Sequence, residues 1–145
     1  MIVADANVMV RALRSRNGAS NRILRGMLVG EIEFALSPAV VIEYEDVLLR
    51  PGILGPNPWI APDQVGTLLD TLCKVCVPAL PRFRFRPFLR DPKDDLYVEC
   101  ALAAGAQLVV SDDRHFRDPN LRAFGLDVRT AVEFEADWQN RRTPT

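Results

Sequence analysis

Residues 94–113, DDLYVECALAAGAQLVVSDD, form the stretch that decides the fold. After the two leading aspartates, small and apolar side chains continue in a helical pattern that Gly105 ends. The following QLVVS indicates a short apolar strand. That strand runs directly into Asp112 and Asp113. A helix with acids at its start therefore feeds a strand with acids at its end.

A second apolar strand opens the chain. MIVAD (residues 1–5) shows no alternation of polar and apolar residues and ends in Asp5, which is typical of a sheet covered on both faces. The other expected elements are, in chain order, a helix to about Leu13, a helix over 20–29, a strand in EFALS, a helix over 38–50 capped by Ser37, a helix over 62–74, a strand in VCVP, a helix over 94–104, strands in QLVVS and LDVRT, and a helix over 131–138. This alternation predicts a one-domain α/β fold over residues 1–138, a three-layer α/β/α sandwich around a central, mostly parallel sheet, followed by a polar tail over 139–145.

The bulk composition is that of an ordinary globular domain. The 145 residues are 48% hydrophobic and 26% charged. No apolar run approaches the ~20 residues that a membrane-spanning helix needs, and the N-terminus lacks the basic region of a signal peptide, so we expect a cytoplasmic protein. Cys73 and Cys76 form a C-x-x-C pair, but with a single histidine in the chain a zinc site lacks ligands. Buried, reduced thiols are expected instead.

The acids of the two apolar strands are expected to meet. Ligands of parallel sheets bind outside the carboxyl ends of the strands, where Asp5 and Asp113 both lie. Asp94 opens the helix that feeds the second strand, and it falls on the apolar face beside Tyr97 and Val98. A capping aspartate is worth only ~0.3–1 kcal/mol and would more naturally point to solvent. Asp94 is therefore a third candidate for the same site.

A further acid is expected from the helix in SPAVVIEYEDVL (residues 37–48), although helical geometry alone does not choose between Glu43 and Glu45. Carboxylates gathered at one sheet edge repel one another, and a hard divalent cation removes that conflict. Carboxylates without paired histidines favour Mg²⁺ or Mn²⁺ over zinc. Because such ions lower the pKa of bound water and stabilise charge on a leaving oxygen, the pattern indicates phosphodiester hydrolysis.

Four motifs follow one another along nearly the whole chain: VADANVMV, SPAVVIEYEDVL, DPKDDLYVECALAAGAQLVVSDDRHF and the closing AVEF. In this order they resemble the PIN-domain family and, within it, the toxins of VapC-type bacterial toxin–antitoxin pairs. The resemblance implies a PIN-like, Rossmann-like fold and a Mg²⁺- or Mn²⁺-dependent endoribonuclease. By motif position it implies four catalytic acids, of which all but the second bind the metal: Asp5, Glu43, Asp94 and Asp113. It also implies an antitoxin partner and a homodimer.

Other residues are expected to support the acids or to hold the substrate. The supporting set comprises Asn7, Ser111, Asp91, Asp95 and Asp112. In PRFRFRPFLR (residues 81–90), arginines alternate with phenylalanines just before the acids. On an edge strand, this alternation would send the phenylalanines into the core and leave the arginines free to hold phosphates. The arginines expected to hold RNA are Arg11, Arg84, Arg86 and Arg114.

Two other functions fit parts of the pattern. A non-catalytic RNA- or protein-binding module on a PIN-like scaffold would not need the acids, yet all four are present. An aspartate-dependent phosphatase usually carries D-x-D where this chain has Asn7 in the second position, and it also needs a well-placed lysine. Lys93 is the one lysine near the acids, and it precedes Asp94 in a loop. The nuclease is therefore favoured over both alternatives.

Overall fold

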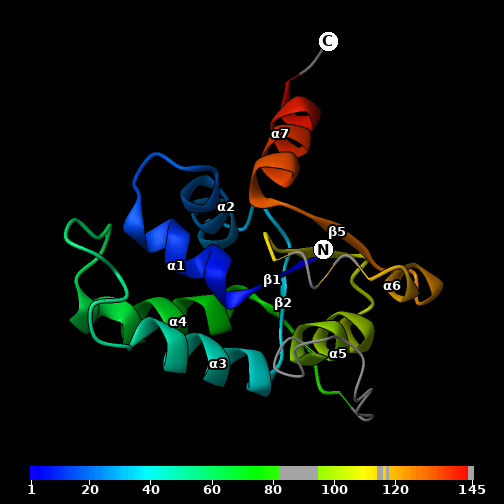
Figure 1. Ribbon diagram of the computed structural model, residues 1–145, viewed down its shortest axis with the longest axis horizontal. Helices are drawn as coiled ribbons and strands as arrows, with labels where there is room; N and C mark the ends of the chain where they lie inside the picture. Colours follow the sequence, from blue (N-terminus) through cyan, green and yellow to red (C-terminus); the bar gives the residue numbers. More distant parts are fainter. Residues whose placement is uncertain (82–94, 114–115, 117, 144–145) are drawn as a thin grey trace.

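The computed structural model describes residues 1–81, 95–113, 116 and 118–143 (Figure 1). The strands are β1 (Ile2–Ala4), β2 (Ala35–Leu36), β3 (Val77–Pro78), β4 (Leu108–Val110) and β5 (Asp127–Arg129). The helices are α1 (Ala6–Arg14), α2 (Ala19–Leu28), α3 (Pro38–Leu48), the 3₁₀ turn η1 (Pro62–Gln64), α4 (Val65–Val75), α5 (Asp95–Ala104), α6 (Asn120–Ala123) and α7 (Ala131–Arg142). The α/β class expected from the sequence is confirmed.

The sheet is built around β1. β4 pairs with β1 in parallel, with Ala4 opposite Val110, and β5 pairs in parallel with β4. On the other side, a parallel bridge from Ile2 to Phe34 leads to β2, which pairs in parallel with β3. Across the described residues the strand order is therefore β3-β2-β1-β4-β5.

This strand order creates a topological switch point. The chain leaves β1 for β2 and β3 on one side and returns through α5 to β4 on the other side. The segments that follow β1 and β4 therefore start side by side at the carboxyl edge of the sheet, and the chain leaves them in opposite directions. Open α/β sheets bind ligands at such points. The fold thus places Asp5 and residues 111–113 next to each other.

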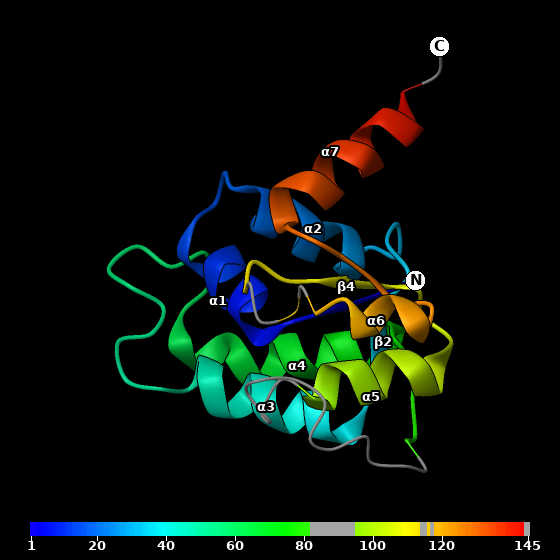
Figure 2. The same cartoon turned by 45° about the vertical axis from the view of Figure 1, so that its right-hand side comes forward.

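Helices cover both faces of the sheet. Figure 2 shows α2 and α7 on one side of β1 and β4, and α3, α4 and α5 on the other. Val3 of β1 and Val109 of β4 are fully buried between these layers. Their burial explains why the strands are apolar without alternation. In the described part of the chain, no helix combines the length and the apolarity that crossing a membrane requires.

Local signals explain where the helices begin and end. Ser37 caps α3 by accepting the Val40 N–H at 3.2 Å, and Pro38 occupies the first turn. Thr130 and Glu133 form a reciprocal capping box at the start of α7. After α5, Gly105 has a φ of +73°, a conformation that favours glycine over other residues.

The last helix is longer than the sequence predicts. It continues past Trp138 to Arg142, into the segment expected to be a polar tail. The Arg142 guanidinium forms an ion pair with Glu31 at 2.9 Å and lies 4.7 Å from the centroid of the Trp138 ring. These contacts hold the final turn of α7, and hydrophobic periodicity does not report them.

The expectation of buried cysteines is wrong for the C-x-x-C pair. Cys73 is exposed and Cys76 is half-buried, whereas Cys100 in α5 is buried, and all three are free thiols. The buried face of α4 is formed by the apolar side chains of its leucines, so Cys73 falls outside that face. Cys73 therefore lies outside the core, and Cys76 packs only against its edge.

Candidate active site

Asp5 is the centre of the candidate site. It follows β1 directly and caps α1, with its Oδ1 accepting the backbone N–H of Asn7 at 2.5 Å. The Asn7 side chain itself is exposed. A cap of this kind is usually solvated, yet Asp5 is only 3% exposed. The position therefore needs more than capping to explain it.

Ser111 connects Asp5 to the loop after β4. Its hydroxyl donates to Asp5 Oδ2 at 2.5 Å, and its oxygen accepts the backbone N–H of Asp113 at 3.0 Å. Ser111 is buried, while Asp113 is half-buried. One hydroxyl therefore fixes both the orientation of the Asp5 carboxylate and the turn that carries Asp113.

The electrostatics of Asp5 are unfavourable for a charged group. Burial raises the pKa of Asp5, and the nearby carboxylates of Asp113 and Asp112 raise it further. The hydrogen bonds from Ser111 and from the Asn7 N–H oppose this increase in the pKa without cancelling it. The fold thus holds Asp5 where its charge is destabilised and where other negative charge is close.

The side chain of Asp112, next to Asp113 in the chain, bonds to two helices. Its Oδ2 forms an ion pair with the Arg11 guanidinium, and its Oδ1 accepts the N–H of Ala131 at 3.1 Å. Both oxygens are therefore engaged, one with α1 and one with the start of α7. Asp112 therefore joins these two helices next to the site.

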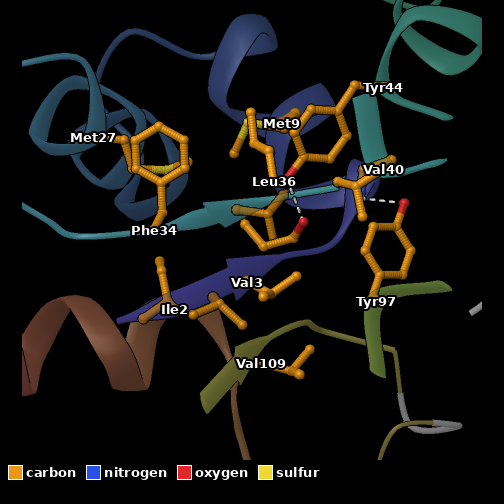
Figure 3. Packing of buried hydrophobic residues seen from close by; sticks show 14 of the residues in the cluster. Ile2, Val3, Met9, Met27, Phe34, Leu36, Val40, Tyr44, Tyr97 and Val109 are labelled. Carbon is orange, nitrogen blue, oxygen red and sulfur yellow. Dashed lines mark hydrogen bonds between the residues drawn. The ribbon is translucent and has the colours of Figure 1, made fainter. Parts of the chain in front are cut away.

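Two buried tyrosines hold the backbone on either side of Asp5 (Figure 3). The Tyr44 hydroxyl donates to the Ala4 carbonyl at 2.5 Å, and the Ala6 N–H donates to the Tyr97 hydroxyl oxygen at 3.0 Å. Burial raises the pKa of Tyr44 well above its ordinary value, so the phenol stays protonated and can donate. Sequence reasoning missed both residues, although each stands within two positions of a candidate acid.

The remaining predicted acids differ in what the structure says of them. Glu43 is half-buried on α3 directly before Tyr44, and it is not among the groups that shift the pKa of Asp5. Asp95 is fully buried at the first position of α5. Among the predicted arginines, Arg11 is exposed and ion-paired to Asp112. Several predicted residues lie outside the described part of the chain: Arg84, Arg86, Asp91, Asp94 and Arg114.

The donor chemistry at this edge suits a hard divalent cation. Asp5 and Asp113 offer carboxylate oxygens, and the repulsion that raises the pKa of Asp5 is what a bound cation would relieve. Mg²⁺ is typically held by one or two carboxylates together with water and substrate phosphates. Within the described residues, no cluster of three or more acidic, histidine or cysteine side chains is arranged to hold a metal. Asp5 and Asp113 would therefore be only part of the ligand set of such an ion.

A hollow of about 570 Å³ lies elsewhere, beside β5 and α6. Phe116, Leu121, Val128 and Arg129 are among its lining residues, and Asp5, Ser111 and Asp113 are not. This hollow is not the candidate site, because the Asp5 carboxylate does not line it.

The sequence model of the PIN domain matches residues 1–115, which include β1, α3, α5 and β4, the elements in or next to which the candidate acids lie. The chain belongs to the PIN-domain family. PIN domains are usually nucleases and typically bind divalent metals, so membership supports, at this coarse level, a nuclease-like hydrolase. Searches among curated proteins and among solved structures gave no significant match.

Proposed function

We propose that this PIN domain is a Mg²⁺- or Mn²⁺-dependent endoribonuclease. The observation that carries the proposal is the buried Asp5 carboxylate, whose pKa is raised by burial and then by Asp113 and Asp112. A structural carboxylate would normally be paired with a cation. A carboxylate held among other acids at a sheet switch point is instead suited to bind a metal ion and, through it, a phosphate.

Each residue has a part in this proposal. Asp5 and Asp113 hold the metal ion together with Asp94, and Glu43 completes the set of catalytic acids. When bound, the ion would supply an activated water and stabilise charge on the phosphodiester. Ser111 keeps Asp5 Oδ2 oriented through its hydroxyl, which donates at 2.5 Å. Asp112 keeps α1 and α7 in place beside the site.

RNA is the proposed substrate, and the toxin of a toxin–antitoxin pair is the proposed biological role. The support is the resemblance of the four sequence motifs to VapC-type toxins. Arg11, whose side chain is 62% exposed next to the site, could reach a phosphate while remaining close to Asp112. The proposal places the protein in the cytoplasm, as a homodimer inhibited by an antitoxin.

The first experiment is cleavage of a mixed pool of structured RNAs by purified protein with Mn²⁺, with EDTA, and with the variants Asp94→Asn and Asp113→Asn. Cleavage is expected only with Mn²⁺ and the native acids. Asp63→Asn, a change at an exposed acid of η1, is the matched control and should cleave like the native protein.

Two outcomes would contradict the proposal. Cleavage that persists in EDTA or in both site variants would point to a contaminating nuclease or a different mechanism. Intact RNA in every lane, from folded protein free of any co-purified partner, would favour the non-catalytic binding module. For the toxin role, induced expression should arrest growth, and the Asp113→Asn variant should not.

A further inference from the structure

We propose that Tyr44 and Tyr97 are positioning residues that set the spacing between Asp5 and the other acids of the site. The proposal rests on the proposed nuclease function for its purpose, but its geometry stands independently. The chain contains two tyrosines, and the structure places the hydroxyls of both against the same short turn of backbone.

The two hydroxyls bracket Asp5 from opposite sides along the chain. Tyr44 is 0% exposed and donates to the carbonyl of Ala4, and Tyr97 is 3% exposed and accepts the N–H of Ala6. The peptide groups on both sides of Asp5 are thereby held by side chains from other elements. A phenol is a rigid ring with few rotatable bonds, so it fixes a distance better than a flexible polar side chain does.

Each tyrosine also belongs to a helix that carries a candidate acid. Tyr44 follows Glu43 directly on α3, and Tyr97 lies two positions after Asp95 on α5. A helical turn is stiff, so a hydroxyl anchored at Asp5 also fixes where the neighbouring acid begins its side chain. The contact that holds Asp5 therefore fixes α3 and α5 relative to it.

Tyr97 also contacts the segment after β4, in which Asp113 and Phe116 lie. Its ring packs edge-on against Phe116, with centroids 6.0 Å apart and an interplanar angle of 61°. The Phe116 N–H donates to the Asp113 carbonyl at 3.2 Å, so Phe116 is bonded to the backbone of this acid. Tyr97 thus contacts both the backbone beside Asp5 and a residue that is bonded to Asp113. Carboxylates that share an ion need such a fixed spacing, because small displacements of ligands cost affinity and rate.

The test uses Tyr44→Phe and Tyr97→Phe, which remove one hydroxyl each and keep the ring. The control is Phe34→Leu, which changes a buried core residue of the segment leading into β2. The Phe34 side chain has no hydroxyl and so forms no hydrogen bond with the backbone around Asp5. Three quantities are measured: amide hydrogen exchange at Ala6 and Asn7, Mn²⁺ affinity by calorimetry, and single-turnover RNA cleavage at saturating Mn²⁺.

For both tyrosine variants we expect Mn²⁺ affinity to weaken about tenfold or more, as for other residues that orient metal ligands. Exchange at Ala6 and Asn7 should accelerate relative to the amides of the last turn of α1. Phe34→Leu should lower the melting temperature while leaving Mn²⁺ affinity and the relative exchange at Ala6 unchanged.

Folded tyrosine variants with native Mn²⁺ affinity and native exchange at Ala6 and Asn7 would overturn the positioning role. The same holds if Phe34→Leu matches them in all three measurements, because the effect would then follow stability alone. If the native protein neither binds Mn²⁺ nor cleaves RNA, the proposed function fails. Hydrogen exchange at Ala6 still decides whether the tyrosines hold the turn.

Discussion

Asp5 directly follows β1 and Asp127 is the first residue of β5 in the same sheet, and the surroundings of these two aspartates are opposite. Asp5 is 3% exposed and has a raised pKa because of burial and neighbouring acids. The Asp127 side chain is 48% exposed, and its hydrogen bond with Arg129 lowers its pKa. Its Oδ2 meets Arg129 Nε at 2.9 Å, and its Oδ1 accepts the N–H of Val128 at 2.9 Å.

The difference separates a structural acid from the acid on which the proposed function rests. Asp127 covers an amide of β5, the edge strand of the described sheet, and so helps to close that edge against unwanted pairing. Asp5 does not have such a stabilising environment, because burial and the neighbouring acids destabilise its ionised form. Perturbed charges of this kind cluster at binding and catalytic sites, and that is the basis on which Asp5 is proposed as a site residue.

The largest expected effect is on Asp5 itself. Asp5→Asn keeps the shape and the acceptor for the Asn7 N–H but removes the charge that binds the cation. Cleavage should fall by more than about 100-fold, beyond the range typical for residues that only orient a ligand. Measured without metal, the variant should be at least as stable as the native protein, because a destabilised charge has been removed. A folded Asp5→Asn protein with native activity would make Asp5 a structural cap like any other.

A smaller effect is expected at Ser111. Ser111→Ala removes the donor to Asp5 Oδ2 and the acceptor of the Asp113 N–H, so both acids lose orientation. Activity should fall by about tenfold, and the acidic limb of the pH–rate profile should move to higher pH because the pKa of Asp5 rises further. Ser20→Ala, at a buried serine of α2, is the matched control. An unchanged pH profile in Ser111→Ala would detach this hydroxyl from the titration of Asp5.

The pH dependence of stability should have opposite signs at the two acids. In metal-free protein, the folded pKa of Asp5 is raised above 3.8, so its contribution is full below that value and is lost as pH rises through the folded pKa. The folded pKa of Asp127 is lowered from 3.8, so its contribution is present above that value and is lost as pH falls through the folded pKa. Urea unfolding in EDTA between about pH 3 and pH 7, for native protein and for Asn variants at each position, measures both slopes. Slopes of the same sign would remove the contrast.

The sequence predicted the fold and the proximity of Asp5 and Asp113 because both depend on local signals. Apolar strands, glycines after helices and Ser37 before Pro38 mark the elements, and the strand-end rule brings Asp5 and Asp113 together. The tyrosine contacts could not be predicted in the same way. Tyr97 has the spacing of an ordinary core residue, and its hydroxyl meets the Ala6 N–H across a sequence separation of 91 residues.

The contacts of Asp112 could not be predicted from the sequence either. Its partner Arg11 is 101 residues away along the chain, and tertiary packing alone decides that the two meet. Arg11 was expected to hold RNA, which nothing in the structure tests, and the structure shows that its guanidinium pairs with this acid. The extent of α7 was missed for the same reason, since Glu31 lies far from Arg142 in sequence.

The smallest expected effect is at Asp127, and it is the one that most directly tests the contrast. Asp127→Asn retains an oxygen that can accept the Val128 N–H and removes only the charge that pairs with Arg129, which also lies 3.3 Å from Asp137. Because the pair is exposed, the free energy of unfolding should fall by no more than about 1 kcal/mol, and RNA cleavage should be unchanged. Asp127→Ala, which also uncovers the amide, should cost more stability and still leave cleavage intact. If either variant lost activity on the scale of Asp5→Asn without unfolding, the β5 edge would be part of the reactive centre, and burial among acids would no longer distinguish the site.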